Sequence, residues 1–309
     1  MPLPPRPTAD PFDPAVMRLF DQYVHGDIDR RGFLQGAARF AAGSAGAAGL
    51  LAALTPQFAA AQQVRPDDPR LATRTLQFAA PLGHGTGSGY LAKPAHATGP
   101  LPVVLVIHEN RGLNPHIEDI TRRLALEGFL AFAPDALFSL GGYPGDEDAA
   151  RALFAKLDQA KCREDFLAAA RLLLAIEGGN GKLGVVGFCY GGATTNFLAT
   201  RMPEVIAAAP FYGGAPETAE VAHIKAELLV VLADNDERVN AGWPEYERAL
   251  KAAGVHYTLL QPPGTQHGFN NDTTPRYDQA AAALAWQQTV ALFKRTLGGA
   301  DAGRAKAQG

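Results

Sequence analysis

The sequence has few cysteines, few charged residues and no long apolar run. Its 309 residues include two cysteines, too few for the disulfide framework of a small secreted protein, so a hydrophobic core must stabilise the fold. Charged residues make up 19% of the chain and the net charge is −3, which gives no basic face for a nucleic-acid partner. Because no apolar run is long and clean enough to span a bilayer, we expect no stable membrane insertion.

The first 61 residues differ from the rest, because they contain no lysine and no glutamate. The pair Arg30-Arg31 is followed by a mildly apolar stretch over 36–54 and then by Ala59-Ala60-Ala61. This order of features resembles a twin-arginine export signal. We therefore interpret residues 1–61 as a signal segment recognised by the twin-arginine export machinery, and residues 62–309 as the main domain of a periplasmic or secreted protein.

A second interpretation of this segment stays open, in which it forms a helix pair that packs on the main domain of a cytoplasmic protein. In the run 14–23, apolar side chains recur at helical spacing, as expected for a helix with one buried face. Arg39 also interrupts the apolar stretch, which an export signal tolerates poorly.

From residue 71 onward, apolar runs typical of strands alternate with helical patterns. We predict strands at 73–78, 88–92, 102–108, 129–133, 182–187, 205–211, 227–233 and 255–260. Helices are predicted at 117–127, 146–157, 163–176, 191–201, 244–253 and 276–297. Strands that alternate with helices of this length indicate an α/β fold, with a mostly parallel central sheet covered by helices on both faces.

The strongest local motif is Gly187-Phe188-Cys189-Tyr190-Gly191, where a predicted strand ends and a helix begins. A nucleophile on such a sharp turn needs small neighbours, and the N-terminus of the following helix favours a thiolate. We expect Gly191 and Gly192 to keep the start of that helix open to a ligand. The alternative is a structural cysteine in a tight turn.

A cysteine nucleophile needs a base, and the base needs an acid that orients it. His267 and the acids Asp234 and Asp236 lie in loops that follow two later strands, so they reach the same edge of a parallel sheet as Cys189. The loop after the strand 102–108 carries Glu109 at the same edge. The backbone N–H groups of Asn110 and Tyr190 are candidates for an oxyanion hole.

Together these motifs resemble the dienelactone hydrolase family of the α/β-hydrolase superfamily, over residues 73–297. The resemblance implies an α/β-hydrolase fold with Cys189 as nucleophile, His267 as base and Asp236 as orienting acid. It also implies that Glu109 takes part in activating the cysteine; its alternative is a surface ion pair with Arg111. Family members open enol-lactone or related ester rings through an acyl group on sulfur, without metal or cofactor, so the expected partner is a small ester or lactone.

The sequence departs from the family where the substrate carboxylate would bind. Members that act on dienelactone hold this group with arginines, but the segment 136–139 contains none. Arg276 and Arg111 are the candidates for binding an acidic group here.

Three other functions stay open. The protein could be a broad carboxylesterase or thioesterase, a non-catalytic ligand-binding protein, or a redox sensor in which Cys162 and Cys189 form a disulfide. His108 is expected to be a buried core group, and we predict no metal site because the histidines show no metal-ligand spacing. These histidines include His25, His96, His116, His223 and His256.

The export interpretation makes a testable prediction. If a signal peptidase cleaves after Ala61, the mature protein in its native host begins at Gln62, and its intact mass shows the loss of the first 61 residues. Intact-mass spectrometry of the native protein measures this directly. A mature chain that begins at Met1 would contradict cleavage.

Overall fold

The computed structural model describes residues 12–41 and 43–298. One sheet of eight strands lies at the centre, in the order β1-β2-β4-β3-β5-β6-β7-β8. The strands are β1 Leu71–Ala80, β2 Gly85–Pro94, β3 Leu101–Ile107, β4 Leu130–Pro134, β5 Gly179–Phe188, β6 Val205–Phe211, β7 Glu227–Val231 and β8 Tyr257–Leu260. All eight predicted strands are present, most of them shifted at their ends by a few residues.

The sheet is mostly parallel, as predicted. β1 and β2 form an antiparallel hairpin, and β2 also pairs antiparallel with β4. Every pairing from β4 through β8 is parallel. The loops that follow β3, β5, β7 and β8 therefore emerge at the same edge of the sheet.

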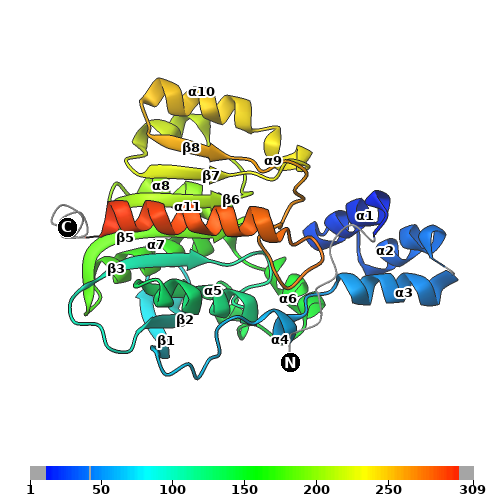
Figure 1. Ribbon diagram of the computed structural model, residues 1–309, viewed down its shortest axis with the longest axis horizontal. Helices are drawn as coiled ribbons and strands as arrows, with labels where there is room; N and C mark the ends of the chain where they lie inside the picture. Colours follow the sequence, from blue (N-terminus) through cyan, green and yellow to red (C-terminus); the bar gives the residue numbers. More distant parts are fainter. Residues whose placement is uncertain (1–11, 42, 299–309) are drawn as a thin grey trace, which may run out of the picture.

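Helices cover both faces of the sheet (Figure 1). Both faces of the sheet are apolar and need cover, as the central strand β3 illustrates. Its Val104 and Val106 belong to the apolar cluster on one face, and its Leu105 and Ile107 to the cluster on the other. The helices of the main domain are α5 Pro115–Leu126, α6 Glu147–Phe154, α7 Gln159–Ala175, α8 Tyr190–Arg201, α9 Glu237–Asn240, α10 Trp243–Ala253 and α11 Gln279–Leu297. Residues of α5 and α11 belong to the first cluster, and residues of α7 and α8 to the second.

Two sequence predictions need correction at element boundaries. The last helix begins at Gln279 and not at 276, because the Asp278 side chain caps it by accepting from the N–H of Ala281. Arg276 therefore lies in the preceding loop, where its side chain is buried. His108 follows β3 instead of ending it, but it is fully buried, and its Nε2 accepts from the Ala136 N–H at 3.1 Å, as expected of a core group.

The N-terminal segment is helical and packs on the main domain. It contains α1 Pro14–His25, α2 Arg30–Ala37, α3 Gly43–Leu54 and the short α4 Phe58–Ala61. Side chains such as Phe20, Phe33 and Leu51 build an apolar core separate from the two cores of the sheet. In Figure 1, α1–α3 lie beside the sheet on the side of α6 and α9. The packed-helix interpretation therefore describes this segment, with three longer helices instead of a pair.

None of the described helices is both long and apolar enough to cross a membrane. The export interpretation stays a prediction.

The turn between β5 and α8 has a strained backbone. Cys189 adopts φ 56° and ψ −110°, which is unfavourable for any residue with a Cβ. A Cβ on Gly187 would collide with the carbonyl oxygen of Gly191, and a Cβ on Gly191 with that of Ile107 at the end of β3. The glycines therefore let the start of α8 pack directly against the strands. Gly191 is buried in this contact, so it does not leave the open space that we expected at the helix start.

This packing predicts that Gly191→Ala destabilises the protein by roughly 3 kcal/mol, because the new methyl group meets backbone that cannot move away. Urea unfolding measures the effect. Gly214→Ala is the matched control, since a Cβ at that position meets nothing within 4 Å and should leave the free energy of unfolding nearly unchanged. Equal stability of the two variants would contradict this account of the turn.

Candidate active site

The structure brings Cys189, His267 and Asp236 together at the carboxyl edge of the sheet. The Nδ1 atom of His267 lies 2.5 Å from Asp236 Oδ2, and both side chains are buried. A ring nitrogen of His267 lies within 4.8 Å of the Cys189 sulfur. The Nε2 atom of His267 is buried and has no hydrogen-bond partner among the described residues. One ring nitrogen is thus held by the acid, and the other is available to exchange a proton.

Backbone contacts hold the two loops in place. Asn235 and Gln266 form an isolated parallel bridge, so the loop after β7 and the loop after β8 run side by side. Asp234 accepts a hydrogen bond from the Gly264 N–H at 2.8 Å. Of the two acids considered from the sequence, Asp234 therefore holds the loops together, and Asp236 contacts the histidine.

Glu109 lies at the same edge and is positioned by an amide. Its Oε2 atom accepts from Asn271 Nδ2 at 2.8 Å. The sequence analysis considered an ion pair between Glu109 and Arg111. Arg111 instead pairs with Glu147, with its Nε atom 3.7 Å from Glu147 Oε2. Glu109 also lines the cavity described below.

The site favours the thiolate form of Cys189. Burial opposes the charged form, but the positive charge of His267 and the hydrogen bond from His25 outweigh it and lower the pKa of Cys189 to about 6. Burial likewise opposes a positive charge on His267. The thiolate and the Asp236 carboxylate outweigh this effect and raise the pKa of His267 to about 9. The two groups therefore stabilise each other as an ion pair.

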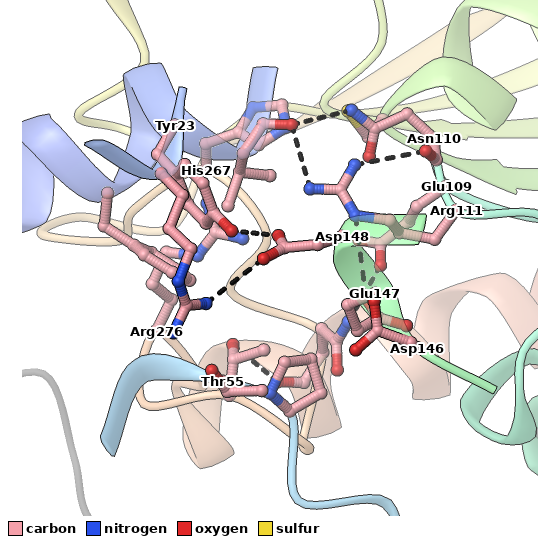
Figure 2. A pocket seen from close by; sticks show the side chains of 17 residues that line it. Tyr23, Thr55, Glu109, Asn110, Arg111, Asp146, Glu147, Asp148, His267 and Arg276 are labelled. Carbon is pink, nitrogen blue, oxygen red and sulfur yellow. Dashed lines mark hydrogen bonds and ion pairs between the residues drawn. The ribbon is translucent and has the colours of Figure 1, made fainter. Parts of the chain in front are cut away.

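A cavity of about 130 Å³ opens beside these groups. Figure 2 shows that side chains from two distant parts of the chain face it, with Tyr23 on one side, Glu109 and Asn110 on the other, and Asp148 between them in contact with Tyr23. Arg111 and Arg276, the candidates for binding an acidic group, both line it. The residues that the N-terminal segment contributes to the lining are Phe20, Tyr23, Val24, Arg30, Thr55 and Pro56. The active-site cavity thus lies between the main domain and the N-terminal helices.

His25 is a site residue that the sequence analysis missed. Its Nε2 atom lies 3.7 Å from the Cys189 sulfur, and its ring is 4.8 Å from the His267 ring, centre to centre. No local motif marks this histidine, and it lies more than 160 positions from the cysteine, so only the docking of α1 reveals it. With Cys189 and His267 it forms a set of ligand atoms that a thiophilic metal ion could use.

Cys162 has a different environment from Cys189. It is fully buried among the apolar residues on one face of the sheet, and both cysteines are free. The disulfide that we considered between them is therefore absent. Burial, followed by the charges of Asp165 and Asp158, raises the pKa of the Cys162 thiol to about 12, which makes it a poor nucleophile.

A cysteine on a strained strand–helix turn, with a histidine and an acid after later strands, defines an enzyme of the α/β-hydrolase fold. Comparison with known proteins gives the family. The model of the dienelactone hydrolase family matches residues 88–297. The chain belongs to this family and is a carboxylic ester hydrolase.

Several relatives and solved structures support this assignment. A protein of Synechocystis named "Putative carboxymethylenebutenolidase" is 35% identical over 230 residues, which cover 68% of this chain and 92% of the relative. The crystal structure of a dienelactone hydrolase homologue from Klebsiella pneumoniae is 30% identical with a TM-score of 0.64, and the match covers 72% of this chain and 99% of the other. A hydrolase fragment of Escherichia coli, YghX, is 50% identical over 105 residues, which cover 34% of this chain and 90% of the fragment.

A second family model, described as YqhI-like, matches residues 4–42. The match lies entirely within the N-terminal segment and does not overlap the dienelactone hydrolase match.

The two thiol environments predict selective alkylation. At pH 7, iodoacetamide should label Cys189 and leave Cys162 unlabelled, because one pKa lies at about 6 and the other at about 12. The rate at Cys189 should rise as the pH passes through about 6 and level off above it, since the reactive thiolate forms on deprotonation. Mass spectrometry of the labelled peptides measures both. Preferential labelling of Cys162 in the folded protein would contradict these environments.

Proposed function

We propose that this protein hydrolyses a small carboxylic ester or lactone through a Cys189–His267–Asp236 triad, with a thioester intermediate on the sulfur. The observation that carries the proposal is the arrangement of His267, whose Nδ1 is held 2.5 Å from Asp236 while Nε2 stays unpaired close to Cys189. In this arrangement the imidazole can receive a proton on Nε2, and the carboxylate stabilises the resulting cation.

The reaction has two stages. In the first, the Cys189 sulfur forms a bond to the carbonyl carbon, and the carbonyl oxygen becomes an oxyanion. The oxyanion collapses, the bond to the alcohol oxygen breaks, and His267 gives this oxygen a proton. In the second stage His267 takes a proton from water, the hydroxide attacks the thioester, and the sulfur leaves as thiolate with release of the acid.

The oxyanion is proposed to bind the backbone N–H groups of Asn110 and Tyr190. Tyr190 opens α8, and the first N–H groups of a helix have no acceptor within the helix. Asn110 belongs to the loop after β3 and lines the cavity. Each such donor contributes about 3 kcal/mol in the transition state. Glu109, held by Asn271, is proposed to manage the thiol proton while substrate binds.

The cavity supports a small substrate. Its volume of about 130 Å³ is close to the ~150 Å³ of an apolar cavity that holds one benzene molecule. A five- or six-membered lactone or a short ester fits this space. The Synechocystis relative is named for the opening of a butenolide ring, which supports a lactone as the first substrate to test. Arg111 and Arg276 are proposed to select acidic substrates, although each is already close to a carboxylate, Glu147 and Asp21 respectively.

The test is a hydrolysis screen across lactones and p-nitrophenyl esters with the wild-type protein and Cys189→Ala. Loss of the nucleophile should lower kcat by roughly 10⁴-fold for every substrate that the wild type hydrolyses. Cys162→Ala is the matched control, because it removes the other, buried sulfur and should keep nearly full activity. A Cys189→Ala variant with wild-type turnover would overturn the proposal, and saturable binding without turnover would favour a ligand-binding protein.

A further inference from the structure

His25 ends helix α1, and its ring is fixed in one orientation. Its Nδ1 atom lies 2.8 Å from the carbonyl oxygen of Asp21, one turn earlier in the helix. Because a carbonyl can only accept, Nδ1 carries a proton and donates it to this oxygen. Nε2 is thereby directed at the Cys189 sulfur, 3.7 Å away. The side chain of Asp21 also lies 3.4 Å from Nδ1, which favours the positively charged form of the ring.

The end of α1 is held against the main domain by hydrogen bonds to its last carbonyl groups. The carbonyl oxygen of Val24 accepts from Asn110 Nδ2 at 3.0 Å and from Arg111 Nη2 at 3.1 Å. The carbonyl oxygen of Tyr23 accepts from Arg151 Nη1 at 2.6 Å. The last carbonyls of a helix lack partners within the helix and carry partial negative charge, so arginines bind them well. His25 is therefore presented to the sulfur by a defined interface.

The contact leaves room for substrate. Tyr23 and Val24 line the cavity, and His25 is not among the described residues that do so. The cavity still reaches Cys189, His267 and Glu109 while the N-terminal helices are in place. An imidazole that merely blocked the sulfur would occupy this space, so the geometry favours a supporting role over an inhibitory one.

We propose that His25 is a positioning residue of this active site, which holds the Cys189 sulfur as a thiolate from the N-terminal segment. The inference rests on the proposed function, since it takes Cys189 as the nucleophile. Under this proposal the sulfur is stabilised by two imidazoles, His267 from the main domain and His25 from α1. The reactivity of the enzyme then depends on a helix that lies outside the region matched by its hydrolase family.

The charges around His25 and Cys189 act in both directions. Burial opposes a charged His25, but the hydrogen bonds to Asp21 and Cys189 raise its pKa to about 10 and favour the cationic ring. Arg238 Nη2 also lies 3.0 Å from His25 Nε2, and because a guanidinium can only donate, this contact favours the neutral ring and competes with the sulfur for Nε2. The other ionisable groups that face the sulfur and the two imidazoles are Glu109, Tyr212, Asp236 and Arg276.

The test compares the pH dependence of Cys189 alkylation in full-length variants. In the wild type the rate of reaction with iodoacetamide should have its midpoint near pH 6. In His25→Ala the midpoint should move up by about one pH unit, toward the ~8.5 of an unperturbed cysteine, so that alkylation at pH 7 slows about twofold. His25→Gln keeps an N–H donor without the charge, and its midpoint should fall between the two. Gln22→Ala changes an exposed side chain of the same helix and should match the wild type.

A second readout separates this role from simple structural support. The acidic limb of the pH profile of kcat/KM should move up with the alkylation midpoint, while KM above that limb stays nearly constant, because His25 does not line the cavity. An unchanged midpoint in both His25 variants, with or without a lower melting temperature, would overturn the inference. Histidine NMR of the wild-type protein needs no variant, and a His25 ring that is neutral at pH 7 would overturn it as well.

The outcomes also distinguish this inference from the proposed function. If Cys189→Ala keeps wild-type turnover, the nucleophile is wrong, whatever the His25 variants do. If Cys189→Ala is inactive and the alkylation midpoint of His25→Ala equals that of Gln22→Ala, the triad stands and the role of His25 fails.

Discussion

The backbone turn at Cys189 is the constraint on which the rest of this structure depends. A residue with a Cβ is held at a positive φ there, and this is possible because Gly187 and Gly191 let strand β5, helix α8 and the end of β3 approach within backbone contact. The turn places the sulfur at the carboxyl edge of the sheet. The loops after β3, β7 and β8 then need only short extensions to bring Glu109, Asp236 and His267 to it.

The core of the main domain is apolar, whereas the surface on which α1 docks is polar and charged. Both faces of the sheet are covered by apolar side chains, whereas the contact between α1 and the main domain depends on arginines, carboxylates and helix-end carbonyls. Tyr23 also hydrogen-bonds through its hydroxyl to Asp148, and Arg30 contacts the same carboxylate. Polar contacts of this kind define the orientation of a docked helix more strictly than apolar packing does, because each depends on direction. A precise orientation is what the proposed positioning of the Cys189 sulfur by His25 requires.

The sequence predicted most of the fold and the proximity of Cys189, His267 and Asp236, because both have local signatures. Continuous apolar runs mark buried parallel strands, and the glycines around Cys189 mark a turn that few other sequences can make. The start of the last helix was set too early, at 276, since helical periodicity does not reveal which residue caps the helix. His25 could not be predicted, because its contact with Cys189 comes from the docking of one helix on a distant loop. The N-terminal segment shows the same limit: Arg30 belongs to an export-like pair and also contacts Asp148, and the sequence alone does not separate the two uses.

The separation of the hydrophobic cores has a consequence for how this enzyme can diversify. One core belongs to α1–α3, and two others flank the sheet that positions Cys189, His267 and Asp236. Substitutions in the small helical core can therefore shift the N-terminal helices that line the cavity without disturbing the packing of the sheet that positions Cys189, His267 and Asp236. Selection on this small core can then alter the substrate preference and, through the contact of His25 with the sulfur, the reactivity of Cys189, while the two cores of the sheet stay unchanged.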